Sequence, residues 1–196
     1  MAISRLRMAS DGAGVSTLVA FFGCPLRCKY CANWICHEED TPRESYLPEH
    51  LVSVLNQDDI YFKMTGGGVV FGGGEPLLQA EFIHEVCNMA DPLWKKRIET
   101  SLYAKWDSIH LLLNDIDEWL IDIKDVQPKI YKNYTGKDND TVISNLKKMI
   151  AITPKEKILI RIPHISNFNT SDDVKQSVET IQTMGFSRIE EFEYAI

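Results

Sequence analysis

The chain has 196 residues, of which 44% are hydrophobic and 25% charged, a composition that supports a sizeable core and excludes extensive disorder. Its formal net charge of −7 argues against non-specific binding to nucleic acid or to an anionic membrane, since both need basic patches. The sequence contains no run of about 18 apolar residues, so no transmembrane helix is expected, and its first residues contain no apolar signal core. We therefore expect a cytoplasmic protein.

Apolar runs of strand length alternate with longer amphipathic stretches along the chain. Strands are expected at residues 17–22, 69–72, 97–100, 119–123, 158–162 and 189–194. Helices are expected between them, at residues 48–56, 77–90, 105–114, 139–152 and 171–184. The helical assignments rest on apolar side chains that recur at a spacing of three or four residues, as Val142, Leu146 and Met149 do.

This order of elements predicts repeated right-handed βα units and a parallel sheet. A complete (β/α)₈ barrel typically needs about 250 residues, and this chain has room for about six units. We therefore predict an α/β fold, a partial (β/α)₆ TIM-type barrel or an open curved sheet of parallel strands. Because no linker or internal repeat divides the sequence, residues 1–196 are expected to form a single domain. Ligand sites in such sheets lie at the C-terminal ends of the strands.

Three of the five cysteines follow the first predicted strand in the segment GCPLRCKYC. The spacing of Cys24, Cys28 and Cys31 is C-x3-C-x2-C, which suits a metal site better than a disulfide framework. Each thiolate can hold one iron of a cubane, and a fourth iron without a protein thiolate would be open to a substrate. A structural zinc completed by Cys36 and its neighbouring histidine is the alternative. Otherwise Cys36 is expected to be a free thiol and Cys87 a buried core thiol.

Small and polar residues follow the second and third predicted strands. Gly73 and Gly74 would let the backbone approach a ligand closely, and Glu75 could accept hydrogen bonds from a charged amino group. The alternative is a simple turn that ends at the following proline. Glu99 and Ser101 flank the end of the third strand, where a carboxylate could bind hydroxyl groups or a cation. The alternative for this pair is a solvent-exposed strand end.

Charged residues also interrupt the fourth and fifth predicted strands. Asp122 and Lys124 alternate along one strand and therefore point to one face, and Arg161 is a similar charge in the next strand. A charge inside an apolar strand is costly unless it is paired or bound to a ligand. These residues predict either a ligand site or internal ion pairs, with Glu75 as one candidate partner of Arg161.

Several of these segments together resemble a known family. The cysteine spacing, with the aromatic Tyr30 before the third cysteine, resembles that of the radical S-adenosylmethionine superfamily. The segment TGGGVVFGGGEPLLQAEF resembles SGGGVTxSGGEPLLQxEF of the activating enzymes of glycyl radical enzymes, and YKNYTGKDNDTVISNLKKM resembles their HxxYTGxxNxxIxxNL. Shorter matches are DGAGVST, IETS, IDIK and IRIP, so the resemblance covers nearly the whole chain.

The resemblance implies a partial (β/α)₆ barrel that carries one [4Fe–4S] cluster on Cys24, Cys28 and Cys31. It implies reductive cleavage of S-adenosylmethionine to a 5′-deoxyadenosyl radical, which abstracts hydrogen from a glycine of a partner glycyl radical enzyme. Radical chemistry on another peptide or on a small metabolite is the alternative. The resemblance also implies an oxygen-sensitive, anaerobic setting and a flavodoxin- or ferredoxin-type reductant, and we expect a monomer without nucleic-acid or membrane partners.

Roles around the cofactor follow from the same resemblance. It implies that the GGE motif binds the methionyl amine, that Lys124 pairs with the methionyl carboxylate, and that Glu99 binds ribose hydroxyls. Asp122 is a candidate ligand of a monovalent cation. The residues expected to bind the cofactor are Tyr30, Gly73, Gly74, Glu75, Glu99, Ser101, Asp122, Lys124 and Arg161.

Overall fold

In the computed structural model, which describes residues 1–8, 11–38 and 40–194, one seven-stranded sheet runs through the molecule. Its strands lie side by side in sequence order as β1 (Ala2–Met8), β2 (Val15–Phe21), β3 (Gly68–Gly73), β4 (Lys95–Thr100), β5 (Glu118–Asp122), β6 (Ile158–His164) and β7 (Ile189–Glu193). Strands β2 to β7 pair in parallel, which confirms the predicted parallel sheet.

Strand β1 corrects the prediction of parallel strands alone, because it pairs antiparallel with β2 at one edge of the sheet. Its sequence AISRLRM is mostly exposed and lacks the apolar run by which the other strands are recognised. Leu6 has a φ of 53°, and the register shifts between Ser4 and Arg7, so the strand is bulged. Charged side chains and a bulge are features that protect an edge strand from pairing with another molecule.

Within the described residues, seven α-helices connect the strands. They are α1 (Pro48–Leu55), α2 (Asp59–Thr65), α3 (Ala80–Met89), α4 (Trp106–Leu112), α5 (Pro128–Thr135), α6 (Asp140–Ile152) and α7 (Ser171–Thr183). The sequence does not predict α2 and α5, because each is short and offers little apolar periodicity. No helix in the described part of the chain is both long and apolar enough to cross a bilayer.

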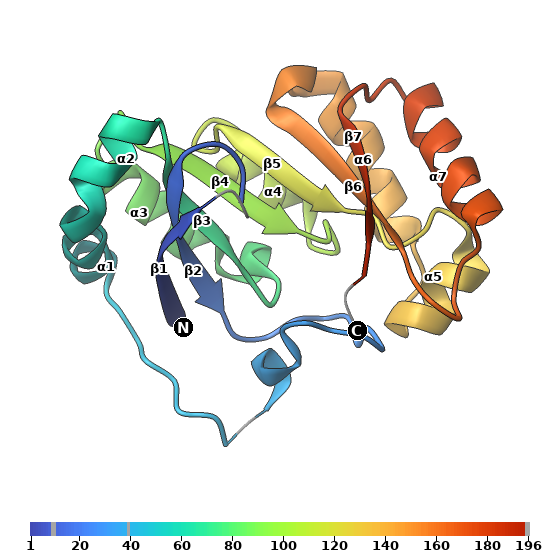
Figure 1. Cartoon of the computed structure of the whole chain (residues 1–196), viewed down its shortest axis with the longest axis horizontal. Helices are drawn as coiled ribbons and strands as arrows, with labels where there is room; N and C mark the ends of the chain where they lie inside the picture. Colours follow the sequence, from blue (N-terminus) through green and yellow to red (C-terminus); the bar gives the residue numbers. More distant parts are fainter. Residues whose placement is uncertain (9–10, 39, 195–196) are drawn as a thin grey trace.

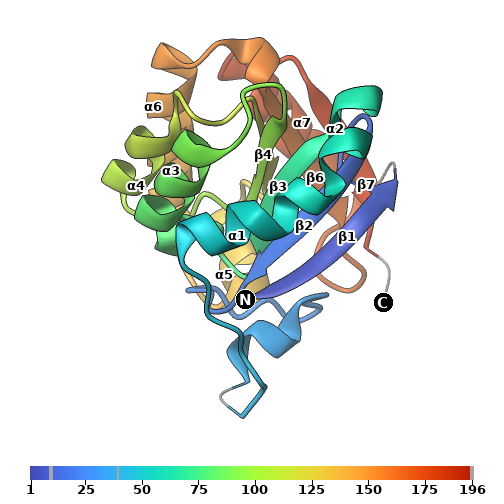
Figure 2. The same cartoon turned by 90° about the vertical axis from the view of Figure 1, so that its left-hand side faces the viewer.

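The helices cover the outer face of the curved sheet. Since the strands follow sequence order and βα crossovers are right-handed, successive helices fall on the same side. Figure 2 shows α3, α4 and α6 on one side of the strands, with β1 and β7 at the other. Among the described residues β1 and β7 are the two ends of the strand order and do not pair with each other. The sheet is therefore a partial barrel that is open between these edges (Figure 1).

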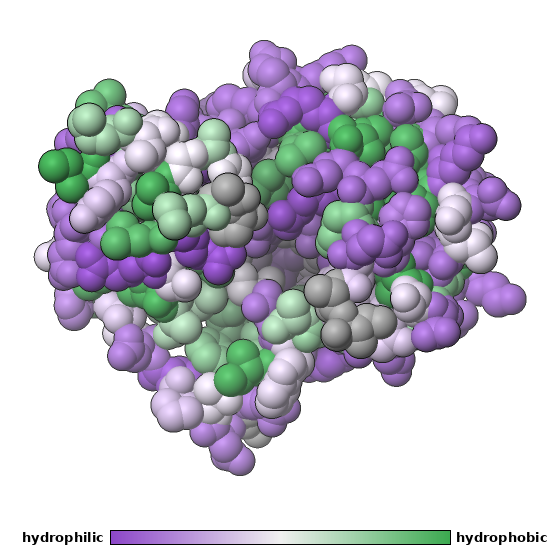
Figure 3. Space-filling model, in the orientation of Figure 1, coloured by the Kyte–Doolittle hydropathy of each residue, from purple (hydrophilic) through white to green (hydrophobic). Residues whose placement is uncertain are grey.

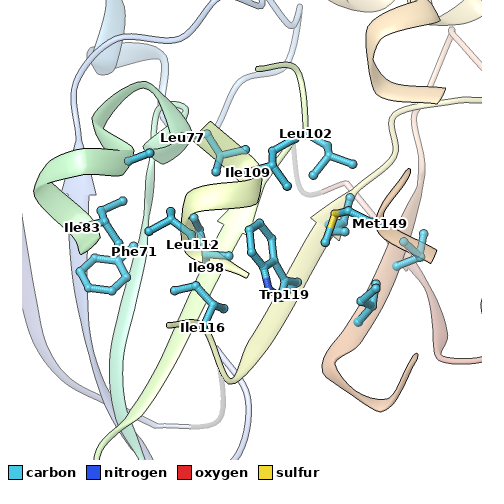
Figure 4. Close-up of a cluster of buried hydrophobic side chains, with 14 of the residues drawn as sticks. Phe71, Leu77, Ile83, Ile98, Leu102, Ile109, Leu112, Ile116, Trp119 and Met149 are labelled. Carbon is cyan, nitrogen blue, oxygen red and sulfur yellow. The ribbon is translucent and has the colours of Figure 1, made fainter. Parts of the chain in front are cut away.

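The core lies between the sheet and these helices. Ile98 pairs in register with Trp119, and both side chains are fully buried. Figure 4 shows apolar side chains of α3 and α4 packed over them. The labelled members from these helices are Ile83, Ile109 and Leu112.

Alternation along the strands places the charged residues on the opposite, concave face. Glu99 follows the core residue Ile98, and Asp122 follows the core residue Ile121. Arg161 lies between two core isoleucines of β6 and is in register with Asp122. Because successive side chains of a strand point to opposite faces, these three charges project into the concave side of the barrel.

Candidate functional site

The cysteine loop leaves the end of β2 and meets the C-terminal ends of the other parallel strands. Cys24, Cys28 and Cys31 line one cavity of about 100 Å³. Leu26, Ala32 and Asn33, within or just after the cysteine loop, also line it, and the rest of its wall comes from residues at or just beyond strand ends, namely Gly73, Gly74, Glu99, Thr100, Ser101, Asp122, Lys124 and Tyr194. Most of the predicted site residues are therefore brought together at the edge where α/β sheets bind ligands.

The GGE motif holds one side of the cysteine loop. The amide of Gly74 donates to the carbonyl of Phe21 at 2.8 Å, and the amide of Glu75 donates to the carbonyl of Gly23 at 2.8 Å. A Cβ at Gly74 would lie 2.2 Å from the Gly23 oxygen, and one at Gly73, whose φ is +92°, would lie 2.8 Å from the backbone of β2. The glycines are needed because any side chain would push the loop away from β3.

The YTG stretch holds the other side of the loop. The amide of Arg27 donates to the carbonyl of Thr135 at 2.8 Å, and that of Lys29 donates to the carbonyl of Tyr134 at 3.1 Å. These carbonyls belong to the last turn of α5, where helix oxygens lack a partner within the helix. Gly136, with a φ of 77°, ends the helix there. Both residues that flank Cys28 are thus fixed to one helix end.

Glu75 lies behind the cavity wall and does not line the cavity. Its carboxylate accepts hydrogen bonds from Thr100 Oγ1 at 2.6 Å, from Ser101 Oγ at 2.6 Å and from Ser101 N at 3.0 Å. It is 1% exposed, and burial raises its pKa despite these hydrogen bonds. In this arrangement Glu75 positions Thr100 and Ser101, which do line the cavity. A direct bond from Glu75 to a methionyl amine stays a prediction.

A network of ion pairs crosses the cavity wall between neighbouring strands. Arg161 Nε lies 2.7 Å from Asp122 Oδ1, and Arg161 Nη1 lies 3.1 Å from Glu99 Oε1. Lys124 Nζ lies 3.2 Å from Asp122 Oδ2. The alternative pairing of Arg161 with Glu75 is therefore wrong, because the strand register brings Asp122 opposite Arg161.

The pKa values of this network favour its charged forms at Asp122 and Lys124. Burial alone would raise the pKa of Asp122, but Lys124 and Arg161 together hold it below its usual value. Burial would lower the pKa of Lys124, but Asp122 and Tyr194 raise it above its usual value. Glu99 differs, since burial raises its pKa and Arg161 opposes that change only in part. These shifts favour a positively charged Lys124 at the cavity wall.

An aromatic cluster closes the site beside the third cysteine. The Tyr30 ring lies 5.6 Å from that of Phe168 and 6.3 Å from that of Tyr134, measured between centroids. Tyr194 packs on Tyr134 at 6.2 Å, and its hydroxyl accepts a hydrogen bond from Lys124 Nζ at 3.2 Å. Tyr30 itself does not line the cavity, whereas Tyr194 does. Sequence reasoning missed Tyr194, although its place at the end of the last predicted strand was an available signal.

Burial favours the protonated thiol at two cysteines of the loop, Cys24 and Cys28. Burial raises the pKa of Cys24 to about 12. Burial also raises the pKa of Cys28, and the positive charge of Lys124 works against that rise. Cys36 is buried and is not among the residues lining the cavity, while Cys87 is buried in the core as predicted. Cluster binding at this loop must therefore release protons.

The donor set fits an iron–sulfur cubane with one iron left open. Three cysteines line the cavity, and Gly73 and Gly74 line it without side chains. A cubane held by cysteine thiolates needs one thiolate for each iron that the protein binds. Among the residues that the structure describes, no group of three or more His, Cys, Asp or Glu side chains has the arrangement for a single metal ion.

A second, larger cavity of about 420 Å³ adjoins the first at the opening of the barrel. It shares Glu99, Asp122 and Tyr194 with the cysteine-lined cavity, and Figure 3 shows a hollow on this face with hydrophilic residues around it. Its remaining walls come from Arg7 and Asp11 at the β1 edge, from Glu190, Phe192 and Glu193 of β7, from Arg161 of β6 and from Ala32, which also lines the first cavity. The site is thus reached through the gap between β1 and β7.

Comparison with known proteins identifies curated relatives over most of the chain. The (2S)-3-sulfopropanediol dehydratase activating enzyme of Klebsiella oxytoca is 27% identical, over 94% of this chain and 80% of the relative. The 4-hydroxyphenylacetate decarboxylase activating enzyme of Clostridioides difficile is 29% identical, over 83% of this chain and 71% of the relative. The isethionate sulfite-lyase activating enzyme of Nitratidesulfovibrio vulgaris is 24% identical, over 90% of this chain and 78% of the relative.

Solved structures share the fold. Streptococcus suis SuiB, bound to its precursor peptide SuiA, matches 91% of this chain with a TM-score of 0.70 at 16% identity. This chain spans 38% of the SuiB chain. A domain of the pyruvate-formate lyase-activating enzyme of Bacteroides vulgatus matches 65% of this chain and 78% of that domain, with a TM-score of 0.53 at 27% identity. The family model of the Radical SAM superfamily matches residues 18–185, and the chain therefore belongs to the radical S-adenosylmethionine superfamily.

Proposed function

We propose that this protein is an activating enzyme of a glycyl radical enzyme, and that it removes a hydrogen atom from a glycine of that partner. The observation that carries the proposal is the match to relatives that are each named as an activating enzyme, over 83–94% of the chain. The GGGV, GGEPLLQ and YTG segments of the sequence agree with this reading.

Membership of the superfamily implies a [4Fe–4S] cluster and S-adenosylmethionine as cofactors. Cys24, Cys28 and Cys31 would hold the cluster, since their thiols line one cavity. When bound, the cluster supplies the electron that splits S-adenosylmethionine into methionine and a 5′-deoxyadenosyl radical. The protein's own contribution is to fix the backbone of the loop through hydrogen bonds to the GGE turn and to α5.

The strand ends would bind and orient S-adenosylmethionine. Lys124 offers a positive charge for the methionyl carboxylate, and the backbone of Gly73 and Gly74 can approach the methionyl amine. Glu99 and Ser101 present a carboxylate and a hydroxyl suited to ribose. The remaining predicted contacts are less direct: Arg161 orients Asp122 and Glu99, Glu75 orients Ser101, and Tyr30 packs beside the third cysteine.

The partner's glycine would enter through the gap between β1 and β7. The larger cavity leads from this gap to Asp122, Glu99 and Tyr194 on the wall of the smaller one. Glycine suits this access because it has no side chain to block the approach to its Cα hydrogen. A docked partner would also cover the opening and exclude water from the radical.

The proposal also covers the oligomeric state of the protein, its electron donor and a possible bound cation. We expect a single domain that acts as a monomer in the cytoplasm and receives electrons from a flavodoxin- or ferredoxin-type protein. A monovalent cation at Asp122 would have to compete with Arg161, whose guanidinium already contacts both Asp122 and Glu99. Potassium titration of cofactor binding tests that point.

The deciding experiment uses the reconstituted, reduced protein, S-adenosylmethionine and a glycyl radical enzyme encoded in the same genome. We expect a doublet in the electron paramagnetic resonance spectrum, which loses its splitting when the partner's glycine carries deuterium at Cα. The Cys28→Ala protein is the control and should give no signal. Transfer of deuterium to 5′-deoxyadenosine from a small metabolite, with none from the partner, would refute the activase assignment while leaving the radical chemistry in place.

A further inference from the structure

Tyr194 is held in place by its backbone and by its ring. Its amide donates to the carbonyl of His164, at the end of β6, at 3.1 Å. Its ring packs on those of Phe192 and Tyr134, at centroid distances of 5.8 Å and 6.2 Å. These contacts fix a residue that follows the last strand, so its hydroxyl has a defined place on the wall of the cysteine-lined cavity.

Both the hydroxyl and the ring of Tyr194 contact Lys124. Lys124 Nζ donates to Tyr194 Oη at 3.2 Å and lies 5.2 Å from the centroid of the ring. An ammonium group has three N–H donors, and Asp122 Oδ2, also at 3.2 Å, accepts a second one. The residues that the structure describes offer Lys124 no further acceptor, so its third N–H is available to a ligand in the cavity that it lines.

The two acceptors of Lys124 differ in charge. Asp122 is an anion, and its other oxygen lies 2.7 Å from Arg161 Nε, so its charge is shared between two cations. The Tyr194 hydroxyl is a neutral acceptor, and it therefore orients the ammonium without cancelling its charge. Lys124 is thus held in position and still attracts an anionic ligand.

We propose that Tyr194 is a positioning residue for S-adenosylmethionine, and that it holds the Lys124 ammonium in the direction in which the methionyl carboxylate binds. The inference rests on the proposed pairing of Lys124 with that carboxylate. Without Tyr194 the lysine side chain gains rotamers that turn away from the cavity. The entropy of restoring the binding rotamer is then subtracted from the affinity for the cofactor.

The first test measures the binding of S-adenosylmethionine to the oxidised, cluster-loaded protein by equilibrium dialysis, where no cleavage occurs. Tyr194→Phe keeps the ring over Lys124 and loses the hydroxyl, so the Kd should rise roughly three- to tenfold. Tyr194→Leu loses both contacts and should bind more weakly still. Tyr61→Phe is the control, because Tyr61 is 48% exposed on α2, and it should bind as the parent does. An unchanged Kd in Tyr194→Phe overturns the inference.

The second test asks whether Tyr194 acts through Lys124. Lys124→Met removes the charge and keeps much of the length of the side chain. In that background Tyr194→Phe should cause no further rise in Kd, because the interaction between the two side chains is already lost. A full three- to tenfold rise in the double variant, by the same hydrogen-bond reasoning, would place the action of Tyr194 elsewhere and overturn the inference.

The rate of 5′-deoxyadenosine formation completes the comparison. At saturating S-adenosylmethionine the Tyr194→Phe rate should stay within about twofold of the parent, because the lost contact affects binding at the carboxylate and not the bond that breaks. A fall in that rate as large as the loss of affinity would contradict a role in positioning alone. The partner enzyme takes no part in these measurements, so their failure leaves the proposed activase function standing, whereas a parent protein that does not bind S-adenosylmethionine would refute both.

Discussion

At the scale of single residues, some charged side chains of the site form internal ion pairs and others are available to a ligand. Asp122 is held by Arg161 on one oxygen and by Lys124 on the other. Lys124 also binds the Tyr194 hydroxyl, and its side chain is 7% exposed. Because a buried ammonium needs a partner, Asp122 keeps Lys124 charged and oriented toward the cavity. The Asp122 carboxylate thus keeps the Lys124 ammonium in a charge state and orientation that suit an anionic ligand.

The Asp122→Asn substitution tests, in the cluster-free protein, whether the ion pairs of Asp122 stabilise the fold. Near neutral pH it should lower the free energy of unfolding by roughly 3–5 kcal/mol, because Lys124 and Arg161 lose a buried partner. The pKa of Asp122 is lower in the folded protein than its usual value of 3.8, so its stabilisation is complete above that value. It is lost as pH falls through the lower folded pKa. The difference between parent and variant should therefore shrink toward acid pH.

Urea unfolding at several pH values measures that difference. Asp138→Asn is the matched control, since Asp138 is 63% exposed and pairs with the exposed Lys132. It should change stability by less than about 0.5 kcal/mol. A penalty for Asp122→Asn that stays constant down to acid pH would contradict the ion-pair account.

At the scale of elements, two motifs that read as ligand-binding sequences also have a structural role. The GGE turn after β3 and the YTG end of α5 clamp the cysteine loop from opposite sides through backbone hydrogen bonds. The loop therefore keeps its path without help from its own side chains. Sequence patterns find β3 but not α5, because an eight-residue helix with two tyrosines and several polar residues shows little apolar periodicity.

Alanine substitutions at two glycines separate the cost of a positive φ from the cost of a clash between the GGE turn and β2. Gly73 and Gly66 both have positive φ, but a Cβ at Gly73 would meet the β2 backbone at 2.8 Å, whereas one at Gly66 would meet nothing within 4 Å. Gly66→Ala should lower the free energy of unfolding by about 1–2 kcal/mol. Gly73→Ala adds the clash and should cost roughly 2–5 kcal/mol. It should also reduce iron loading, measured as iron per chain. Equal losses in the two variants would contradict the clamp.

At the scale of the whole molecule, the cysteine loop joins segments that are far apart in the sequence. It contacts the ends of β2 and β3 and the end of α5, while Tyr194 from the last described segment lines the same cavity. The barrel stays open between β1 and β7, so no strand pairing across that gap stiffens this side. A cluster bound at the loop would therefore lie between β2, β3, α5 and the last described segment.

Removal of the cluster tests this connection. Reconstituted protein should contain about four irons per chain and melt at a higher temperature than the cluster-free protein, because a ligand that binds only the folded state stabilises it. Differential scanning calorimetry under anaerobic conditions measures the change. Cys28→Ala should melt as the cluster-free parent does and gain nothing from iron and sulfide. An equal gain in that variant would show that the metal binds elsewhere.

Sequence alone determined the order of strands β2 to β7 and of helices α1, α3, α4, α6 and α7, together with the parallel sheet and the cysteine loop, because apolar periodicity and close cysteine spacing are local properties. Tertiary structure decided which charges meet. Strand register pairs Arg161 with Asp122 rather than with Glu75, and the bonds from Thr100 and Ser101 hold Glu75 behind the wall. Packing also brings Tyr194 to the cavity wall, where it contacts Lys124 and the Tyr134 ring of α5. Such contacts depend on register and packing between residues 25 to 70 positions apart in the sequence, which no local pattern encodes.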